Sequence, residues 1–237
     1  MEIEQIRRAQ TIFTGIAEDY DRPAQLFGLL QYRSWHAALV DEVAARNPRR
    51  VLDMCTGTGA IAAALRARTG AEVVAVDITR AMLEQARRRP GLSGVHLVQA
   101  AAQAPPFAPG CFDAVVFSYL LRYVEDVPAT LAALGALVRP GGLLASLEFG
   151  VPGHPVARMA WQLYTGILLR AGLALRSPGW RRVGGFLGPS IRDFYARHPV
   201  QSLEAQIAAL GFTCHPTRQL SLGGGVLMTA TRLPAAS

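Results

Sequence analysis

The sequence predicts an α/β fold with a doubly wound mixed sheet of seven strands, the last of which is antiparallel. Three observations lead to this prediction. Short apolar runs alternate with helical patterns over residues 50–149, a glycine turn follows the first run, and the last two runs lie too close together for a crossover helix. The length of 237 residues and the hydrophobic content of 51% fit one large core, so we expect a single domain over residues 1–237.

The first segment, residues 1–47, has a helical pattern, and we expect it to form a helical N-terminal cap. Charged residues stand where an export signal would need an apolar segment: Glu2, Glu4, Arg7 and Arg8. The three cysteines are too few and too far apart for a disulfide framework or a metal site. The sequence therefore predicts a cytoplasmic protein with no metal ligands.

Residues 48–150 form the predicted cofactor-binding core, and two more strands follow near the end of the chain. The candidate strands are residues 50–55, 72–77, 95–98, 113–118, 143–149, 212–218 and 226–232. The helices expected between them are residues 61–68, 80–88 and 127–137. Only residues 219–225 separate the last two runs, which is enough for an antiparallel hairpin but not for a helix.

An insertion rich in aromatic residues, 151–199, is expected to form a substrate lid over the carboxyl ends of the strands, where open α/β sheets bind ligands. Its most apolar stretch, residues 156–175, is interrupted by Arg158 and Arg170. This pattern is too broken for a membrane-spanning helix but is compatible with a lipid-facing lid. Residues 200–237 complete the chain with a predicted helix and hairpin.

The formal net charge of +7 comes from 24 basic and 17 acidic residues. Such a balance suits an anionic partner or a membrane surface. The arginines are scattered without the interleaved aromatic residues of a nucleic-acid groove, so we expect no nucleic-acid partner. Peripheral contact with a membrane and a homodimer both stay open.

The most informative motif is Val51-Leu52-Asp53-Met54-Cys55-Thr56-Gly57-Thr58-Gly59-Ala60, in which an apolar strand runs into a glycine turn and a helix. Glycines let the backbone approach a ligand closely. The next strand ends at Asp77, about 20 residues later, the spacing at which an acidic side chain meets ribose hydroxyls in Rossmann-like folds. Asp53, Gly57, Gly59 and Asp77 are therefore candidate cofactor-binding residues.

The same motif leaves an NAD(P)-dependent oxidoreductase open as an alternative. In the dehydrogenase pattern Gly-x-Gly-x-x-Gly the third glycine position is Ala62 in this chain, and alanine is permitted there. One common proton relay of such enzymes, Tyr-x-x-x-Lys, is excluded because the chain contains no lysine.

The order of motifs resembles class I methyltransferases. The resemblance rests on the glycine loop, on Asp77-Ile78-Thr79-x-x-Met82-Leu83, on Phe112-Asp113-Ala114-Val115-Val116 and on Leu137-Val138-Arg139-Pro140-Gly141-Gly142. It implies S-adenosylmethionine as the cofactor. Asp77 would then hold the ribose, the loop around Thr58 the amino-acid portion, and Ile78 and Met82 the adenine.

A narrower resemblance covers nearly the whole chain and points to the C-methyltransferases of ubiquinone and menaquinone biosynthesis. The matching residues are Tyr20-Asp21, Arg33-x-Trp35, Ser118, Leu121-Arg122-x-Val124, Leu147-Glu148-Phe149 with Pro152 and Pro155, Phe186-Leu187-x-x-Ser190-Ile191, Gly211-Phe212 and residues 222–226. The resemblance implies methylation of a ring carbon in a small aromatic or prenylated-quinol substrate. Thr58, Asp77, the backbone of Ala101 and Ala102, and Ser118 would contact the cofactor.

By the same resemblance, Arg122 and Tyr20 would face the acceptor. Arg122 could stabilise negative charge on a ring oxygen, which makes the ring carbon more nucleophilic. A second interpretation pairs Arg122 with Glu125 or Asp126 at the surface. Glu148 is either a ligand-facing carboxylate or a partner for an arginine.

The chain departs from this family at three places. Ala101 stands where the family has an acidic residue, Arg122-Tyr123-Val124 replaces Arg-Asn-Val, and Gly184-Gly185-Phe186-Leu187 replaces Tyr-x-Tyr-Leu. The last two changes fall near the expected acceptor pocket and favour another aromatic or polyketide-like acceptor as an alternative to a quinol. An O- or N-methyltransferase of a small apolar metabolite and a non-catalytic protein that binds S-adenosylmethionine are the remaining alternatives.

No histidine stands out in the sequence as the base that would take the proton of a ring hydroxyl. His154 and His198 lie in the insertion, where a histidine is more often a surface or loop residue.

Overall fold

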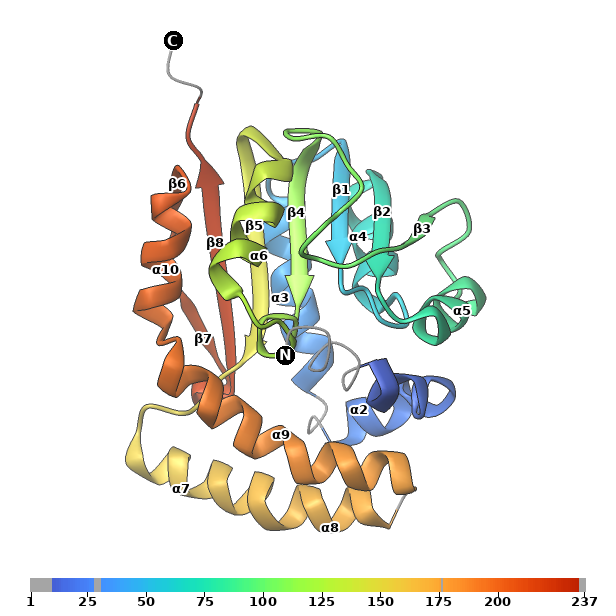
Figure 1. Cartoon of the computed structure of the whole chain (residues 1–237), viewed down its shortest axis with the longest axis vertical. Helices are drawn as coiled ribbons and strands as arrows, with labels where there is room; N and C mark the ends of the chain where they lie inside the picture. The colour runs from blue at the N-terminus through green and yellow to red at the C-terminus, as the bar shows by residue number, and fades with distance from the viewer. Residues whose placement is uncertain (1–9, 28–30, 176, 235–237) are drawn as a thin grey trace.

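The computed structural model describes residues 10–27, 31–175 and 177–234. Within these ranges, a single sheet forms the centre of the molecule, with the strand order β3-β2-β1-β4-β5-β8-β6 and with β7 also paired to β8 (Figure 1). The strands are β1 Arg50–Met54, β2 Glu72–Asp77, β3 His96–Gln99, β4 Phe112–Ser118, β5 Val138–Phe149, β6 Phe212–Cys214, β7 Arg218–Leu220 and β8 Gly225–Arg232.

The strands β3, β2, β1, β4 and β5 are parallel, and β8 runs antiparallel to β5, with Leu143 opposite Thr231. This arrangement confirms the predicted doubly wound sheet with an antiparallel last strand. One detail differs, because the strand expected over residues 212–218 ends at Cys214, and a second short strand, β7, lies mostly in the expected connection; both pair with β8. Pro216 lies between them, and proline has no backbone N–H for a sheet hydrogen bond.

Helices cover both faces of the sheet, as crossover connections between parallel strands require. On one face, α3 (Gln31–Ala44), α4 (Ala60–Thr69) and α5 (Arg80–Arg88) bury residues such as Leu39 and Leu65. On the other face, α6 (Val127–Leu137) and α10 (Val200–Ala209) bury Leu131 and Leu203. Because strand side chains alternate between faces, Val51 packs under the first group of helices and Leu52 under the second.

The N-terminal cap and the lid pack against each other beside the carboxyl ends of the strands. In the described part, the cap includes the short helix η1 (Ala17–Asp19) and α2 (Asp21–Phe27), while residues 1–9 of the predicted cap lie outside the described residues. The lid consists of α7 (Pro155–Leu163), the π-helical segment η3 (Tyr164–Leu168), α8 (Leu169–Ala174) and α9 (Pro178–Arg197). Ile16 of the cap shares a buried cluster with Leu173 and Trp180 of the lid.

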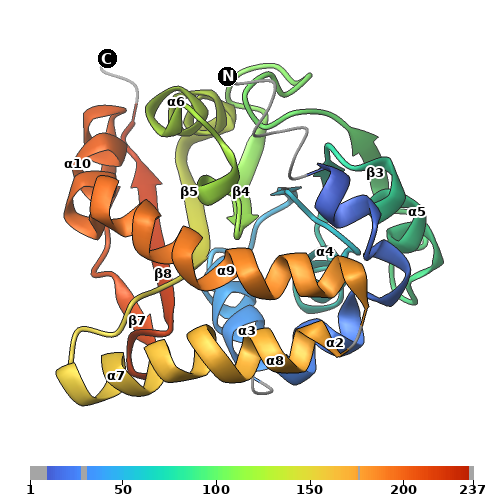
Figure 2. The same ribbon diagram turned by 60° about the horizontal axis from the view of Figure 1, so that its bottom comes forward.

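The lid helices form two layers. α7, η3 and α8 follow one another as a nearly straight rod at the outer edge of the molecule, and α9 lies between that rod and the sheet (Figures 1 and 2). Among the described residues, no helix is both long and apolar enough to cross a membrane.

Candidate active site

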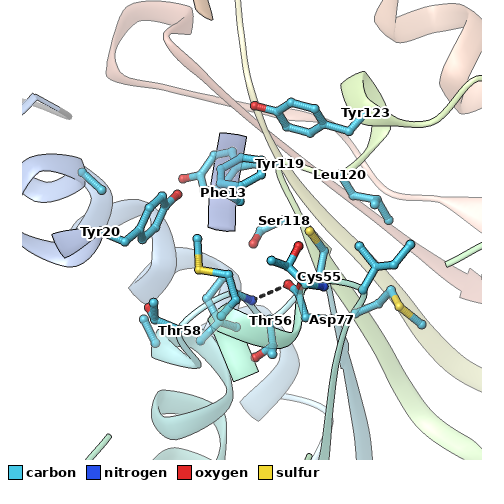
Figure 3. Close-up of a pocket in the computed structure, with 18 of the residues that line it drawn as sticks. Phe13, Tyr20, Cys55, Thr56, Thr58, Asp77, Ser118, Tyr119, Leu120 and Tyr123 are labelled. Carbon is cyan, nitrogen blue, oxygen red and sulfur yellow. Dashed lines mark hydrogen bonds between the residues drawn. The ribbon is translucent and has the colours of Figure 1, made fainter. Parts of the chain in front are cut away.

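A cleft opens at the carboxyl ends of β1, β2 and β4, beneath the N-terminal cap (Figure 3). Its floor carries small polar groups, among them Thr56 and Asp77. Its walls carry aromatic side chains from distant parts of the chain: Phe13, Tyr20, Tyr32, Tyr119 and Tyr123. A cleft with few polar groups and many aromatic ones suits a ligand that is partly polar and partly flat and apolar.

The two glycines of the turn after β1 serve different purposes. Gly57 has φ +57°, and a Cβ atom placed on it would meet nothing within 4 Å, so its backbone borders the open cleft. Gly59 has φ +80°, and its Cβ would lie 2.3 Å from Cδ1 of Leu92. Gly57 thus lets a ligand approach the backbone, whereas Gly59 lets α4 start close to the segment after α5.

Asp77 lies at the end of β2 with its carboxylate facing the cleft, where 5% of the residue is exposed. Its Oδ2 accepts a hydrogen bond from the Gly57 backbone N–H at 2.8 Å, and its Oδ1 accepts one from Thr79 N–H at 2.8 Å. Burial raises the pKa of this carboxyl group, and the two N–H groups oppose that shift. The carboxylate keeps acceptor capacity for two hydroxyl groups.

Thr58 ties the glycine turn to the cap. Its hydroxyl donates to Oδ1 of Asp21 at 2.6 Å, and its carbonyl oxygen accepts from Nε of Arg89 at 2.5 Å. Nη2 of Arg89 also donates to the Thr58 hydroxyl at 2.9 Å and to Oδ2 of Asp21. These bonds hold the start of α2 against one edge of the cleft.

Most of the expected cofactor-binding residues are brought together, but three lie outside the cleft. The lining residues are Gly57, Thr58, Asp77, Ile78, Met82, Ala102 and Ser118. Asp53, Gly59 and Ala101 are not among them, while Gln103, next to Ala102, is. Asp53 is fully buried below the turn and accepts the Thr56 hydroxyl at 2.6 Å, and its burial raises the pKa of its carboxyl to about 7.

Tyr20 lines the cleft, and its hydroxyl points toward the cleft interior (Figure 3). Its ring stacks on Trp180 of α9 with the centroids 5.9 Å apart and meets Phe13 edge-on at 6.2 Å. Burial raises the pKa of the Tyr20 hydroxyl, so this group stays a hydrogen-bond donor at neutral pH.

Arg122 does not line the cleft but lies buried behind Tyr123, which does. Its Nε is 3.8 Å from Oε2 of Glu148, its Nη1 donates to the Ser190 hydroxyl at 3.2 Å, and its guanidinium carbon is 5.0 Å from the centre of the Tyr123 ring. Oε1 of Glu148 accepts the Leu121 N–H at 2.9 Å. The geometry therefore supports Glu148 as a partner for an arginine rather than as a ligand-facing carboxylate. Arg122 is buried, so it does not form the surface pair with Glu125 or Asp126 that the second interpretation expected.

His36 is a cleft residue that the sequence did not single out. It lies one turn before the buried Leu39 and Val40 on α3, so its place on the inward face of that helix was a readable signal. Its Nε2 is buried and has no hydrogen-bond partner among the described residues. Burial, with the charge of Arg89 acting in the same direction and Asp21 opposing it, lowers the pKa of His36 to about 4.

The doubly wound sheet, the antiparallel β8 and the cleft beside a glycine turn define the class I methyltransferase fold. A putative S-adenosyl-L-methionine-dependent methyltransferase of Methanococcus maripaludis has this fold, with a TM-score of 0.64 and 15% identity over 94% of each chain. A SAM-dependent methyltransferase of Aquifex aeolicus matches with a TM-score of 0.62 and 14% identity over 93% of this chain and 98% of its own.

Within that class, the chain belongs to the ubiE/COQ5 methyltransferase family, whose model matches residues 1–231. A demethylmenaquinone methyltransferase of Thermus thermophilus is 34% identical over 207 residues, 85% of this chain and 91% of the relative. A ubiquinone/menaquinone biosynthesis C-methyltransferase UbiE of Dinoroseobacter shibae is 31% identical over 230 residues, 94% of this chain and 90% of the relative. The sequence resemblance to the quinone C-methyltransferases is thereby confirmed, and the protein is a methyltransferase.

Proposed function

We propose that the protein binds S-adenosylmethionine and transfers its methyl group to a carbon atom of a quinol-like ring. One observation carries the proposal: a single cleft joins the Asp77 carboxylate at its floor to an aromatic wall that includes Tyr20 and Tyr123. The names of the relatives support the ring chemistry, since those proteins act on demethylmenaquinone or belong to ubiquinone and menaquinone biosynthesis.

The floor of the cleft fits the cofactor. The Asp77 carboxylate is placed to accept the two ribose hydroxyls, and the open space beside Gly57 lets a ligand approach the backbone. Ile78 and Met82 would pack on the adenine, while the Ala102 backbone and Ser118 line the path toward the acceptor. When bound, S-adenosylmethionine would supply an electrophilic methyl group on its sulfonium sulfur.

The aromatic wall would hold the acceptor. Tyr20 would donate a hydrogen bond to a ring oxygen, because its hydroxyl stays protonated and points into the cleft. Arg122 would act through Tyr123, whose ring it contacts, as a buried positive charge near the acceptor oxygen rather than by direct contact. Holding the ring carbon in line with the bond between the methyl group and the sulfur would supply most of the rate enhancement of methyl transfer.

His36 would take the proton that a ring hydroxyl loses as the ring carbon bonds the methyl group and the carbon–sulfur bond breaks to release S-adenosylhomocysteine. The methylated carbon then gives up its own hydrogen as a proton and the ring oxygen regains one, which restores the aromatic ring. Its lowered pKa leaves the imidazole neutral, so Nε2 is free to accept that proton inside the cleft. A weak base suffices, because a hydroxyl on a ring that is giving up electrons to a methyl group becomes strongly acidic.

A prenylated acceptor dissolves in lipid, so this function implies a cytoplasmic protein with peripheral membrane contact.

The deciding experiment incubates the purified protein with S-adenosylmethionine and a reduced naphthoquinol that lacks one ring methyl group. We expect a product with a new methyl group on a ring carbon, identified by mass spectrometry and NMR. Methylation of the hydroxyl oxygen would replace the proposal with an O-methyltransferase. Saturable S-adenosylmethionine binding without turnover on any quinol, phenol or polyketide would leave a binding protein.

A further inference from the structure

The outer rod of the lid carries an apolar face that no described residue covers. The outer rod comprises α7, η3 and α8, residues 155–174, and the following Leu175. Six of its large apolar side chains are between 55% and 91% exposed: Val156, Met159, Leu163, Ile167, Leu168 and Leu175. Other exposed large apolar residues of the described chain are scattered, as Leu26 and Leu222 are.

These side chains form a stripe rather than a scatter. Val156, Met159, Leu163 and Ile167 are spaced by three or four residues and therefore lie along one side of a helix, and Leu168 and Leu175 continue beside them. The opposite side holds the buried Leu169 and Leu173, which face α9. At 1.5 Å per residue the stripe is about 30 Å long. The helices that carry it lie along the edge of the molecule (Figure 2).

The sequence segment that contains the rod carries most of the surplus positive charge of the chain. Residues 149–192 contain no aspartate or glutamate and six arginines, Arg158, Arg170, Arg176, Arg181, Arg182 and Arg192. The rest of the chain carries 18 arginines and 17 acidic residues, so this segment supplies six of the seven surplus positive charges. Among the described members, Arg170 is exposed and lies one turn beyond Ile167 on the same side of the rod.

We propose that the outer rod docks on an anionic lipid bilayer, with its apolar stripe in the boundary between headgroups and acyl chains and with Arg170 on lipid phosphates. The apolar helix face suits the acyl-chain side of such a surface, and arginine without neighbouring acidic residues suits its anionic headgroups. A second copy of the chain fits the face less well, because a two-fold contact would bring arginines against arginines.

The position of the rod connects this surface to the cleft. α9 packs against α8 on its outer side, and on its inner side Trp180 stacks on Tyr20 while Phe186 stacks on Tyr123 at 6.0 Å. A rod seated on a bilayer would hold the aromatic wall within one helix layer of the lipid. The link to the acceptor rests on the proposed function, whereas the docking itself does not.

The test is co-sedimentation of the full-length protein with vesicles of phosphatidylcholine alone or with one third phosphatidylglycerol, at low and high salt. We expect binding to the anionic vesicles that weakens at high salt. The double variant M159D/I167D should bind at least ten times more weakly, and Arg170→Gln should lose part of the salt-sensitive binding. Leu222→Asp, an equally exposed apolar residue away from the rod, is the matched control and should bind as the unchanged protein does.

Thermal unfolding of each variant shows whether it folds, and since the substituted side chains are exposed, we expect unchanged midpoints. Failure of the unchanged protein to sediment with anionic vesicles, or equal binding by M159D/I167D, would overturn the proposal. A dimer in solution that this variant converts to a monomer would assign the stripe to a second copy instead. Vesicle binding without methyl transfer to a soluble short-chain quinol would refute the proposed function and leave the docking intact.

Discussion

Asp77 combines a structural task with a ligand-binding one. Its two oxygens hold the N–H groups of Gly57 and Thr79, and the same carboxylate faces the cleft. The bond to Gly57 fixes the glycine turn to the end of β2, so the backbone that borders the ligand and the side chain that would bind the ribose move as one unit. Pre-organisation of this kind lowers the ordering cost of binding.

Replacing Asp77 with alanine should weaken S-adenosylmethionine binding by about 1.5 to 3 kcal/mol, because charge-assisted hydrogen bonds to the ribose are lost. Titration calorimetry gives the affinity. Asp113→Ala is the control, since Asp113 also accepts two backbone N–H bonds, from Arg49 and Arg50, but at the amino end of its strand. Unchanged affinity in the Asp77 variant would remove the residue from the cofactor site.

Asp53 makes stability depend on pH. Its pKa of about 7 in the folded protein is above the value of 3.8 for an unperturbed group, so the folded state holds a proton that the unfolded state releases. The stabilisation is complete below about pH 4 and is lost as pH rises through 7. Urea unfolding gives the free energy of unfolding of the unchanged protein and of Asp53→Asn. From pH 5 to pH 8 the unchanged protein should lose stability relative to the variant, by at most about 1.4 kcal/mol per pH unit. A constant difference would mean that Asp53 is ionised in the fold.

His36→Ala should lower methyl transfer by about 10² to 10⁴-fold, the usual contribution of a positioned base, and leave S-adenosylmethionine affinity nearly unchanged. Because the pKa of His36 is about 4, the unchanged enzyme should lose no activity through this group between pH 8 and pH 5. Added imidazole should restore part of the activity, and His154→Ala, at an exposed position, should behave as the unchanged protein. Equal losses of affinity and turnover would mark His36 as structural.

What the sequence could predict about the site follows from how local each signal is. Gly57, Thr58 and Asp77 belong to a strand–turn–helix unit and the strand beside it, so their motif alone placed them in the cleft. Arg122 was harder, because its burial depends on Glu148 from another strand and Ser190 from the lid. The local motif Leu121-Arg122-x-Val124 does not predict contacts with those distant residues.

At the scale of elements, the contact between α2 and the glycine turn joins the N-terminal cap to the core at one edge of the cleft. Asp21 at the start of α2, Thr58 in the turn and Arg89 at the end of α5 share four hydrogen bonds. A charge-assisted network therefore joins α2 to the turn, while Ala24 on the same helix packs against the cluster shared by cap and lid. A small number of polar bonds between elements is typical of segments that open locally.

Arg89→Ala should detach α2 from the turn and cost about 1 to 3 kcal/mol locally, since three of the four bonds use this side chain. Hydrogen exchange should speed up in α2 and in the turn after β1, while the centre of the sheet stays protected. Arg80→Ala on the same helix is the control, because Arg80 pairs with Glu84 at the surface. Equal exchange in both variants would show that packing, not Arg89, holds α2.

The elements themselves were largely predictable. The helices expected at residues 80–88 and 127–137 have those bounds, because a run of helix formers and the stop at Pro140-Gly141-Gly142 are local signals. The early end of β6 at Cys214 and the separate strand β7 were missed, although Pro216 was visible in the sequence. Whether an edge strand ends at a proline depends on which backbone groups the neighbouring strand offers for hydrogen bonds. The local sequence of this segment does not determine how it pairs with β8.

At the scale of the whole molecule, the cap, the core and the lid come together around the cleft. The core supplies Asp77, the cap supplies Tyr20 and His36, and the lid supplies Trp180 behind Tyr20. The contacts that join cap and lid, such as Ile16 with Trp180, form a small cluster separate from the two large ones on the sheet. Binding in the cleft would therefore add contacts where the molecule is least tightly joined.

A cofactor that bridges these parts should stabilise the entire fold and not only the glycine turn. At a concentration 100 times its dissociation constant, S-adenosylhomocysteine should add about 2.7 kcal/mol to the free energy of unfolding. For a chain of this length each kcal/mol raises the unfolding midpoint by about 2 to 4 °C, so we expect a shift of about 5 to 10 °C in a single cooperative transition. NADH at the same concentration should leave the midpoint unchanged, because the cleft is that of a methyltransferase. A shift with NADH alone would contradict the cofactor assignment, and two separate transitions with S-adenosylhomocysteine would show that the ligand does not join cap, core and lid.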